Sequence, residues 1–471
     1  MSKNLVIMLG CGLVLGGCTF MPKYERPTAP IQEAWLNGSS STNGTNGTAE
    51  QMDWREFFDD PRLQQLIAIA LKNNRDLRVA ALRVEEARAQ YRIQRSELFP
   101  GAQGGASLVR QKTSGVATAF GGGTILNTYS VDVGAAYEVD LFGRVRSLKQ
   151  EALERYFASD EARKSVQMAL VSQVATEYLT QLRLREAKAI ANQTLQAVQA
   201  SYNLIQKSFE AGAASELDLR TAEGQVQTVK VASASFLQSL AESENALVVL
   251  IGQPLPADLP TGKAFRDQSL LTDLPLGIPS EVLQRRPDIL AAEHTLKAAN
   301  ADIGAARAAF FPKIVLTGSA GTASAKLGDL FSGPSATWSF SPQITFPIFD
   351  IGSTRSKLDI SKIEKSIEIA NYEKAIQNAF REVANGLATR SILDDKLRAQ
   401  ELLLSAQQKR FDLTTARYKQ GVDNYVDVLL AQQDLFAAQQ NLLQYQMARL
   451  LNSVTLFRSL GGGWKAEPIH E

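Results

Sequence analysis

Residues 131–141 read VDVGAAYEVDL, and apolar side chains alternate with polar or small ones along this run. The same period recurs in WSFSPQITFPI, residues 338–348. Since successive side chains of a strand point to opposite faces, the alternation predicts strands with one apolar and one polar face. Such strands suit a membrane barrel, with lipid outside and water inside, or the half-buried sheet of a soluble protein. The pattern alone leaves these two alternatives about even.

The start of the chain has the features of a bacterial lipoprotein leader and favours the membrane alternative. Lys3 begins a short positive region, and residues 5–15 form an apolar run too short to span a bilayer. The run ends in LGGC, residues 15–18, which resembles a lipobox. We therefore expect residues 1–17 to be a signal peptide and Cys18 to carry a covalent lipid. The alternative is an ordinary secretory signal with an incidental cysteine.

The rest of the chain is two copies of one unit. Phe99-Pro100 recurs as Phe311-Pro312, a shift of 212 residues, and Gly143 recurs as Gly352, a shift of 209. The second shift also aligns Val174 with Val383, Gly212 with Gly421, and Asp218 with Asp427. One three-residue difference over so long a match indicates an internal duplication.

The sequence of each copy predicts the same elements in the same order. They are a helix that ends at Phe-Pro, two strands, a long helix and a final helix. Repeat 1, residues 61–251, has predicted helices at 61–98, 147–211 and 215–251 and strands at 102–112 and 128–141. Repeat 2, residues 280–459, has predicted helices at 280–310, 354–420 and 424–459 and strands at 313–323 and 336–349. Outside the repeats lie an N-terminal segment (18–60) with a polar tether, a connector (252–279) and a C-terminal tail (460–471).

The number of strands requires several copies of the chain. The two repeats supply four strands, whereas a barrel of about eight already fills its interior with side chains. Three copies would pool twelve strands, although the count requires oligomerisation without setting its number. The predicted fold class is thus mainly α with a β-barrel portion.

Several motifs, in order along essentially the whole chain, resemble the NodT-type outer-membrane lipoproteins of resistance-nodulation-division efflux systems. They are LGGC (15–18), YERP (24–27), YEVDLFGR (137–144), RPDILAAE (286–293), AAFFP (308–312), GVDNY (421–425) and LGGGW (460–464). The resemblance implies a TolC-like homotrimer with a twelve-stranded outer-membrane β-barrel on a long periplasmic α-helical barrel. It also implies an equatorial collar built from the N-terminal segment, the connector and the tail.

The resemblance implies the outer-membrane channel of a tripartite efflux system in a Gram-negative bacterium. Such a channel is a passive exit duct for drugs or other toxic small molecules. It would work with an inner-membrane pump of the resistance-nodulation-division class through a periplasmic adaptor (membrane-fusion) protein. A type I secretion duct and a non-conducting coiled-coil lipoprotein that links the envelope layers are the alternatives.

The turns between the last two helices of each repeat are the candidate functional ends. Gly212 and Gly421 are predicted helix C-terminal glycines, and Ser215 and Asn424 are predicted N-caps. By resemblance, the periplasmic gate maps onto Asp427, with Asp423 and Tyr425 nearby. Some relatives have a second acid three residues after the Asp427 position, where this chain has Leu430.

The same turns imply a docking surface for the adaptor. Its candidate contacts are small residues that let a partner approach the backbone: Ala211, Gly212, Ser215, Gly421 and Val422. In the strands, Asp132, Glu138 and Asp140 are expected to face the lumen, and solvated polar faces without selectivity are the alternative.

Composition excludes several other classes of function. The net charge of +1 gives no basic surface for nucleic acid. The two histidines, His294 and His470, have no metal-ligand spacing, and no phosphate-binding loop or cysteine nucleophile is present in the mature chain. We therefore expect no enzymatic activity, no metal and no cofactor apart from the lipid on Cys18.

Overall fold

The structure is a computed structural model, and it describes residues 19–31, 53–112, 114, 125–270 and 284–464. The predicted lipid site at Cys18 lies outside the described residues. The chain divides into two compact units. Unit 1 combines Met1–Thr28, Arg83–Asp160 and Ala291–Glu373, and unit 2 combines Ala29–Leu82, Glu161–Leu290 and Lys374–Glu471. Each unit therefore draws on both sequence repeats.

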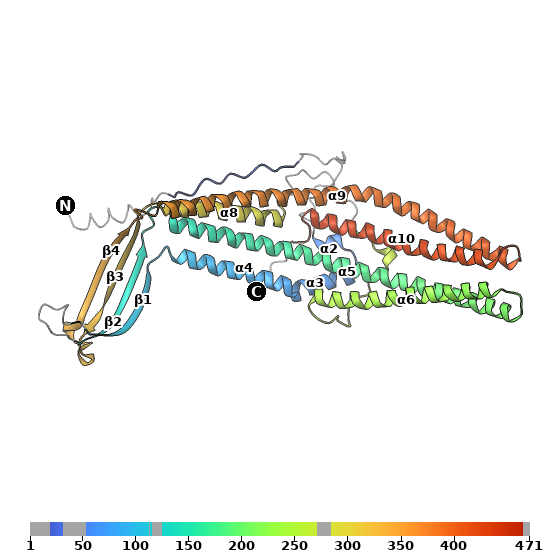
Figure 1. The fold of residues 1–471 in the computed structure, drawn as a ribbon, viewed down its shortest axis with the longest axis horizontal. Helices are drawn as coiled ribbons and strands as arrows, with labels where there is room; N and C mark the ends of the chain where they lie inside the picture. The colour runs from blue at the N-terminus through green and yellow to red at the C-terminus, as the bar shows by residue number, and fades with distance from the viewer. Residues whose placement is uncertain (1–18, 32–52, 113, 115–124, 271–283, 465–471) are drawn as a thin grey trace. The chain divides into compact units, whose positions relative to one another are not determined.

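The strands of unit 1 form one antiparallel sheet in the order β1-β2-β3-β4 (Figure 1). They span Gly101–Lys112, Ile125–Glu138, Lys313–Ser324 and Ala336–Thr345. β2 and β4 end three and four residues before their predicted ends. After β4 comes Phe346-Pro347, and proline has no N–H to continue a ladder. β1 and β4 are the two edges of the sheet.

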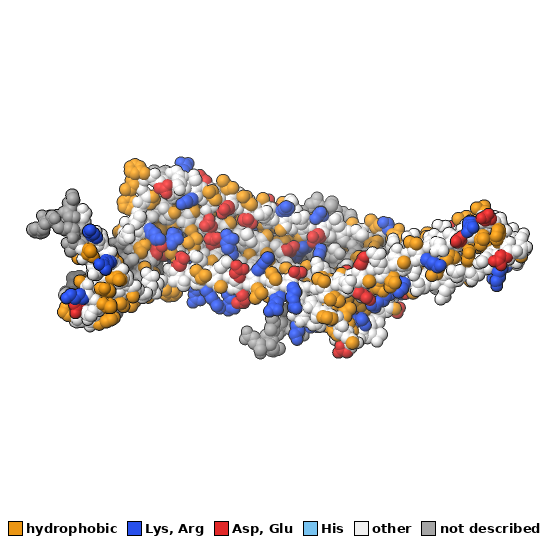
Figure 2. Space-filling model, turned by 60° about the horizontal axis from the view of Figure 1, so that its bottom comes forward, with side chains coloured by type: hydrophobic (Ala, Val, Ile, Leu, Met, Phe, Trp, Pro, Cys, Tyr) orange, Lys and Arg blue, Asp and Glu red, His pale blue; other side chains and the backbone are white. Residues whose placement is uncertain are grey.

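The register of the sheet separates the two kinds of side chain that alternate in the sequence. One row across the four strands is Gly104, Val133, Ala320 and Trp338, and the neighbouring row is Gln103, Gly134, Ser319 and Ser339. Hydroxyl pairs bridge strands on the polar face, Ser107 to Ser130 at 2.7 Å and Ser319 to Ser339 at 2.8 Å. Trp338, on the apolar face, is 81% exposed. Hydrophobic side chains also gather over the strands in Figure 2.

The long helix α5, Arg144–Glu210, begins directly after the sheet, where Asp140 fixes its first turn. The carboxylate of Asp140 accepts hydrogen bonds from the backbone N–H of Val145 (3.2 Å) and of Arg146 (3.0 Å). Acceptors at a helix start satisfy N–H groups that lack intrahelical partners. Asp140 therefore lies beyond β2 and caps a helix, so its predicted place within a strand is wrong.

The other α-helices of the described chain are α2 Trp54–Phe57, α3 Pro61–Asn73, α4 Arg75–Ser96, α6 Glu216–Ile251, α8 Pro287–Ala308, α9 Ile351–Lys419 and α10 Tyr425–Ser459. Of the helices within the described ranges, none has the length and apolar character to cross a membrane.

The single helix predicted at 61–98 is two helices, because Asn74 interrupts it. Asn74 has extended backbone angles (φ −60°, ψ 135°). Its side-chain oxygen accepts from the N–H of Leu77 at 2.9 Å, and its amide donates to the carbonyl of Leu250 at 2.9 Å. Asn74 thus caps α4 and ties it to the end of α6.

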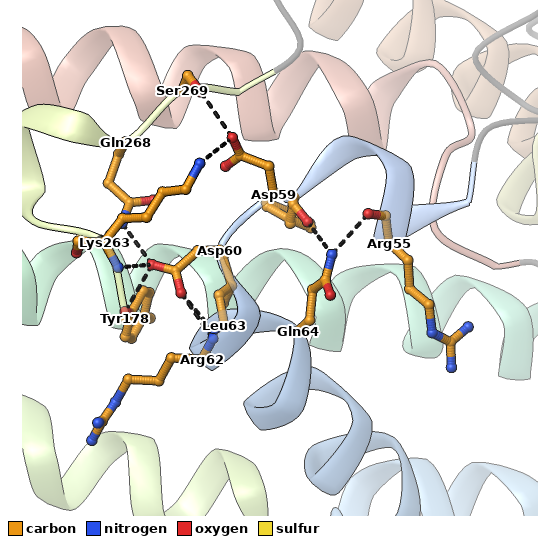
Figure 3. A network of polar contacts seen from close by, with 11 residues as sticks. Arg55, Asp59, Asp60, Arg62, Leu63, Gln64, Tyr178, Lys263, Gln268 and Ser269 are labelled. Atoms are coloured by element: carbon orange, nitrogen blue, oxygen red, sulfur yellow. Dashed lines mark hydrogen bonds and ion pairs between the residues drawn. The ribbon is translucent and has the colours of Figure 1, made fainter. Parts of the chain in front are cut away.

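The core of unit 2 is organised by the buried carboxylate of Asp60, which is 1% exposed (Figure 3). One oxygen accepts from the backbone N–H groups at the start of α3 (2.9 and 3.4 Å). The other accepts from the Tyr178 hydroxyl (2.9 Å), the Lys263 N–H (3.0 Å) and the Gln268 amide (2.7 Å). A buried carboxylate needs such compensation. The network joins the N-terminal segment, α5 and the described part of the connector.

Aromatic packing joins the N-terminal segment to the chain's other end in the same unit. Phe57 stacks on Phe457 of α10, with ring centroids 4.2 Å apart. A side chain at Gly462 would collide with that ring, the nearest atom lying 2.3 Å from the added Cβ. The described end of the N-terminal segment (53–60) and the described parts of the connector and the tail therefore pack together within unit 2, whereas residues 19–28 of the N-terminal segment belong to unit 1.

Candidate functional site at the two helical hairpins

The first hairpin joins α5 to α6 through residues 211–215. Gly212 has φ +75°, a left-handed conformation that glycine adopts without a Cβ clash. The N–H of Ala213 donates back to the carbonyl of Ser208 at 2.8 Å, closing the helix end. Ser215 and Asp218 then form a reciprocal capping box that starts α6.

The second hairpin joins α9 to α10 and repeats this backbone path. Gly421 also has φ +75°, and the N–H of Val422 donates to the carbonyl of Arg417 at 3.0 Å. The side chain of Asn424 accepts from the N–H of Asp427 at 3.0 Å. The glycines and caps predicted from the sequence are thus confirmed in both turns.

The second hairpin has an ion pair that spans its turn. The Arg417 guanidinium donates two hydrogen bonds, each of 2.8 Å, to the two carboxylate oxygens of Asp423. These bonds hold the pKa of Asp423 below its usual range. The equivalent residues of the first hairpin, Ser208 and Ala214, carry no charge.

Tyr425 lies in the contact between the two hairpins. Its side chain is buried in a cluster with Ile205, Ala222, Val428 and Leu429, and the Tyr418 ring lies 5.5 Å away. Burial raises the pKa of Tyr425, so the phenol is protonated at physiological pH. This gate candidate therefore packs the end of unit 2 as a core side chain.

Asp427 is the exposed carboxylate among the three gate candidates. Its backbone N–H is used by the cap, whereas its carboxylate has no hydrogen-bond or ion-pair partner in the described part of the chain. Leu430, one turn later, is 47% exposed. Of the predicted gate residues, Asp427 is thus available to interact, while Asp423 is engaged and Tyr425 is buried.

The five residues predicted to contact an adaptor are all exposed at the two turns. A Cβ added at Gly212 or Gly421 would meet no atom within 4 Å. A partner can therefore approach the backbone closely at both turns.

The three acids predicted to face a lumen have different surroundings. Asp132 is on the polar face, between Gly105 of β1 and Gly321 of β3. Glu138, at the end of β2, binds the Arg144 guanidinium through two bonds of 2.7 Å and the Lys313 ammonium at 3.0 Å. Only Asp132 of this set lies within the polar face without an ion pair in the described residues, since Asp140 pairs with Arg146.

Sequence reasoning missed Arg417 as a member of the site. Arg417 and Asp423 are six residues apart and lie on either side of a glycine turn. The left-handed glycine folds the chain back, which brings these two side chains together. A cation one turn before such a glycine and an acid just before the next N-cap are the signal that could have found the pair.

Comparison with known proteins places the chain in a family. The model of the family described as outer membrane efflux protein matches residues 66–253 and 278–462, which follow the two repeats. The toluene efflux pump outer membrane protein TtgC of Pseudomonas putida is 46% identical over 467 residues, covering 98% of this chain and 96% of the relative. The outer membrane protein OprJ of Pseudomonas aeruginosa is 42% identical over 453 residues, covering 96% and 94%.

Solved structures agree with this assignment. The open state of the Neisseria gonorrhoeae MtrE outer membrane channel superposes with a TM-score of 0.85 at 39% identity, covering 95% of this chain and 99% of that chain. The mainly helical fold with a small antiparallel sheet is thus that of TolC-like channels. The chain belongs to the outer membrane efflux protein family, as the outer-membrane component of an efflux system of Gram-negative bacteria.

Proposed function

We propose that three copies of this chain form a passive outer-membrane exit duct, which an inner-membrane pump drives through a periplasmic adaptor. The observation that carries the proposal is the four-stranded sheet, with one apolar face, one polar face and two edges. Edge strands with free N–H and C=O groups are not tolerated in lipid, so copies must pair edge to edge. Twelve strands would then enclose a lumen lined by the polar face.

The helical hairpins are the proposed entrance to the duct and the proposed docking site of the adaptor. Asp427 is the proposed gate residue, because its carboxylate is exposed at the turn and is not held by an ion pair in the described chain. Symmetry copies of a carboxylate repel one another when they are close and attract cations. The exposed small residues at both turns give an adaptor access to the backbone.

The proposed cargo is small apolar toxic compounds, since one relative is named a toluene efflux pump component. We also propose that Cys18 carries the lipid that anchors the mature chain, because LGGC at residues 15–18 follows a short apolar leader.

Planar-bilayer conductance of the purified protein tests the duct and its gate. We expect small conductance from the native protein and a severalfold larger value after Asp427→Ala, because the alanine cannot make the hydrogen bonds to neighbouring copies that would hold the constriction closed. Asp395→Ala is the control, since Asp395 is an exposed acid in the middle of α9, away from the turns. A protein that never conducts, even with Asp427→Ala, or that forms no heat-modifiable oligomer, would contradict the proposal.

A further inference from the structure

Residues 19–28 form an extended strap that is docked along α8 within unit 1 (Figure 1). The carbonyl of Phe20 accepts from the Arg307 guanidinium at 3.1 Å, and the carbonyl of Pro22 accepts from the Asn300 amide at 2.8 Å. Between them, a Cβ added at Gly304 would lie 2.9 Å from the Cα of Met21. The helix thus offers both donors and space to the strap backbone.

A buried carboxylate on the same helix holds the other end of the strap. The side chain of Glu293 is 2% exposed, and it accepts from Arg26 Nε (3.0 Å), Arg26 Nη2 (2.7 Å) and the Tyr24 hydroxyl (3.2 Å). Lys297 lies 3.2 Å away. Burial by itself raises the pKa of Glu293, but Arg26 and Lys297 outweigh it and hold the pKa below its usual range. Without Arg26, much of this compensation for a buried charge is lost.

The first residues of the strap reach the ends of the strands. The Phe20 ring stacks on Phe311 at 4.6 Å, and Phe311 stacks on Phe142 at 4.7 Å. Phe142 follows β2 closely in sequence, and Phe311 precedes β3. The beginning of the strap is therefore packed where the helices of unit 1 meet its sheet.

We infer that the strap fixes the lipid-bearing N-terminus beside the strand ends, and that Glu293 is the positioning residue of this anchor. The inference rests on the proposed lipid at Cys18. Cys18 precedes Phe20 by two residues, which span at most about 7 Å. A docked strap thus keeps acyl chains on Cys18 near the strand ends, whereas a free tether would let them move away. Docking of the strap then couples lipid insertion to strand insertion.

Limited trypsin digestion of the purified full-length protein measures docking. Lys23 is exposed within the strap, so cleavage after it releases the N-terminal peptide, which mass spectrometry detects. We expect Arg26→Gln and Glu293→Gln to speed this cleavage at least about tenfold, because each breaks the hydrogen-bonded pair that compensates the buried Glu293 carboxylate. Glu154→Gln is the control, since Glu154 binds His294, next to Glu293 in sequence. Unchanged cleavage in both strap variants, or an equal increase in the control, overturns the docking role.

A double-mutant cycle measures the link to the lipid. We expect Cys18→Ser and Arg26→Gln each to lower the amount of heat-modifiable oligomer in outer membranes severalfold. The combined variant should be no worse than Cys18→Ser alone, because a strap without lipid has nothing to position. Losses that multiply overturn the inference. Absence of lipid mass on Cys18 would refute the proposed anchor itself while leaving the trypsin result and the conductance test of the duct intact.

Discussion

The α5–α6 turn and the α9–α10 turn occupy equivalent places in the two repeats, and they share a left-handed glycine and a side-chain N-cap. They differ in how they use the equivalent aspartates. In the first turn, the carboxylate of Asp218 accepts from the N–H of Ser215 at 3.1 Å and completes a capping box. In the second, Asn424 caps α10, Arg417 holds Asp423, and the carboxylate of Asp427 is left exposed. The two turns thus share their backbone signals, and the second adds an arginine–aspartate pair across its glycine.

The largest expected difference between the hairpins is at Tyr425 and its equivalent, Glu216. Tyr425→Ala should lower the free energy of unfolding by about 3 kcal/mol, because it empties a buried site between the hairpins. Glu216→Ala should change it by less than about 0.5 kcal/mol, since that side chain is 71% exposed. Denaturant midpoints of the two variants check this, and equal losses would show that Tyr425 is not a core residue.

The shared backbone predicts equal effects at the two glycines. Gly212→Val and Gly421→Val should each destabilise by roughly 1–3 kcal/mol, because a β-branched residue at φ +75° is strained. Since open space surrounds both positions, strain is the only expected cost. Thermal unfolding of both variants tests this, with Ala211→Val as a control at the exposed neighbour. A tolerated valine at either glycine would break the equivalence of the turns.

Substitution of Asp218 should change stability alone, and substitution of Asp427 should change conductance alone. Asp218→Ala should destabilise by about 0.5–1 kcal/mol through loss of the capping box, without a change in conductance. Asp427→Ala should leave the unfolding midpoint nearly unchanged and raise conductance. Measuring both properties on both variants is decisive, and a conductance rise with Asp218→Ala would remove the distinction.

The smallest expected effect is the pH dependence of the Arg417–Asp423 pair. Its contribution to stability is present at neutral pH and is lost as the pH falls below about 4, through the lowered pKa of Asp423. The native protein should therefore be slightly more stable than Asp423→Asn at pH 7 and no more stable near pH 3. The difference should also shrink in high salt, because both side chains are near the surface. A difference that persists at low pH would argue against the pair.

Local sequence patterns were sufficient to locate the four strands and the two helical turns. The strands predicted after the Phe-Pro helix ends match β1 and β3 to within a residue, and the glycines with their N-caps located both turns, because these signals act between near neighbours in sequence. Helix boundaries that depend on contacts with residues distant in sequence differed from the prediction. Asn74 interrupts its helix, with Leu250, 176 residues away, as one partner.

The sequence by itself determined the duplicated unit and the strands with two unlike faces, and it predicted more than one copy. The tertiary structure alone decided which acids are engaged: Asp423 by Arg417, Asp60 by the connector, and Glu293 by a strap 267 residues away. The physical reason is that a carboxylate's state depends on the donors packed around it, and no periodicity in the chain encodes donors that folding brings from elsewhere.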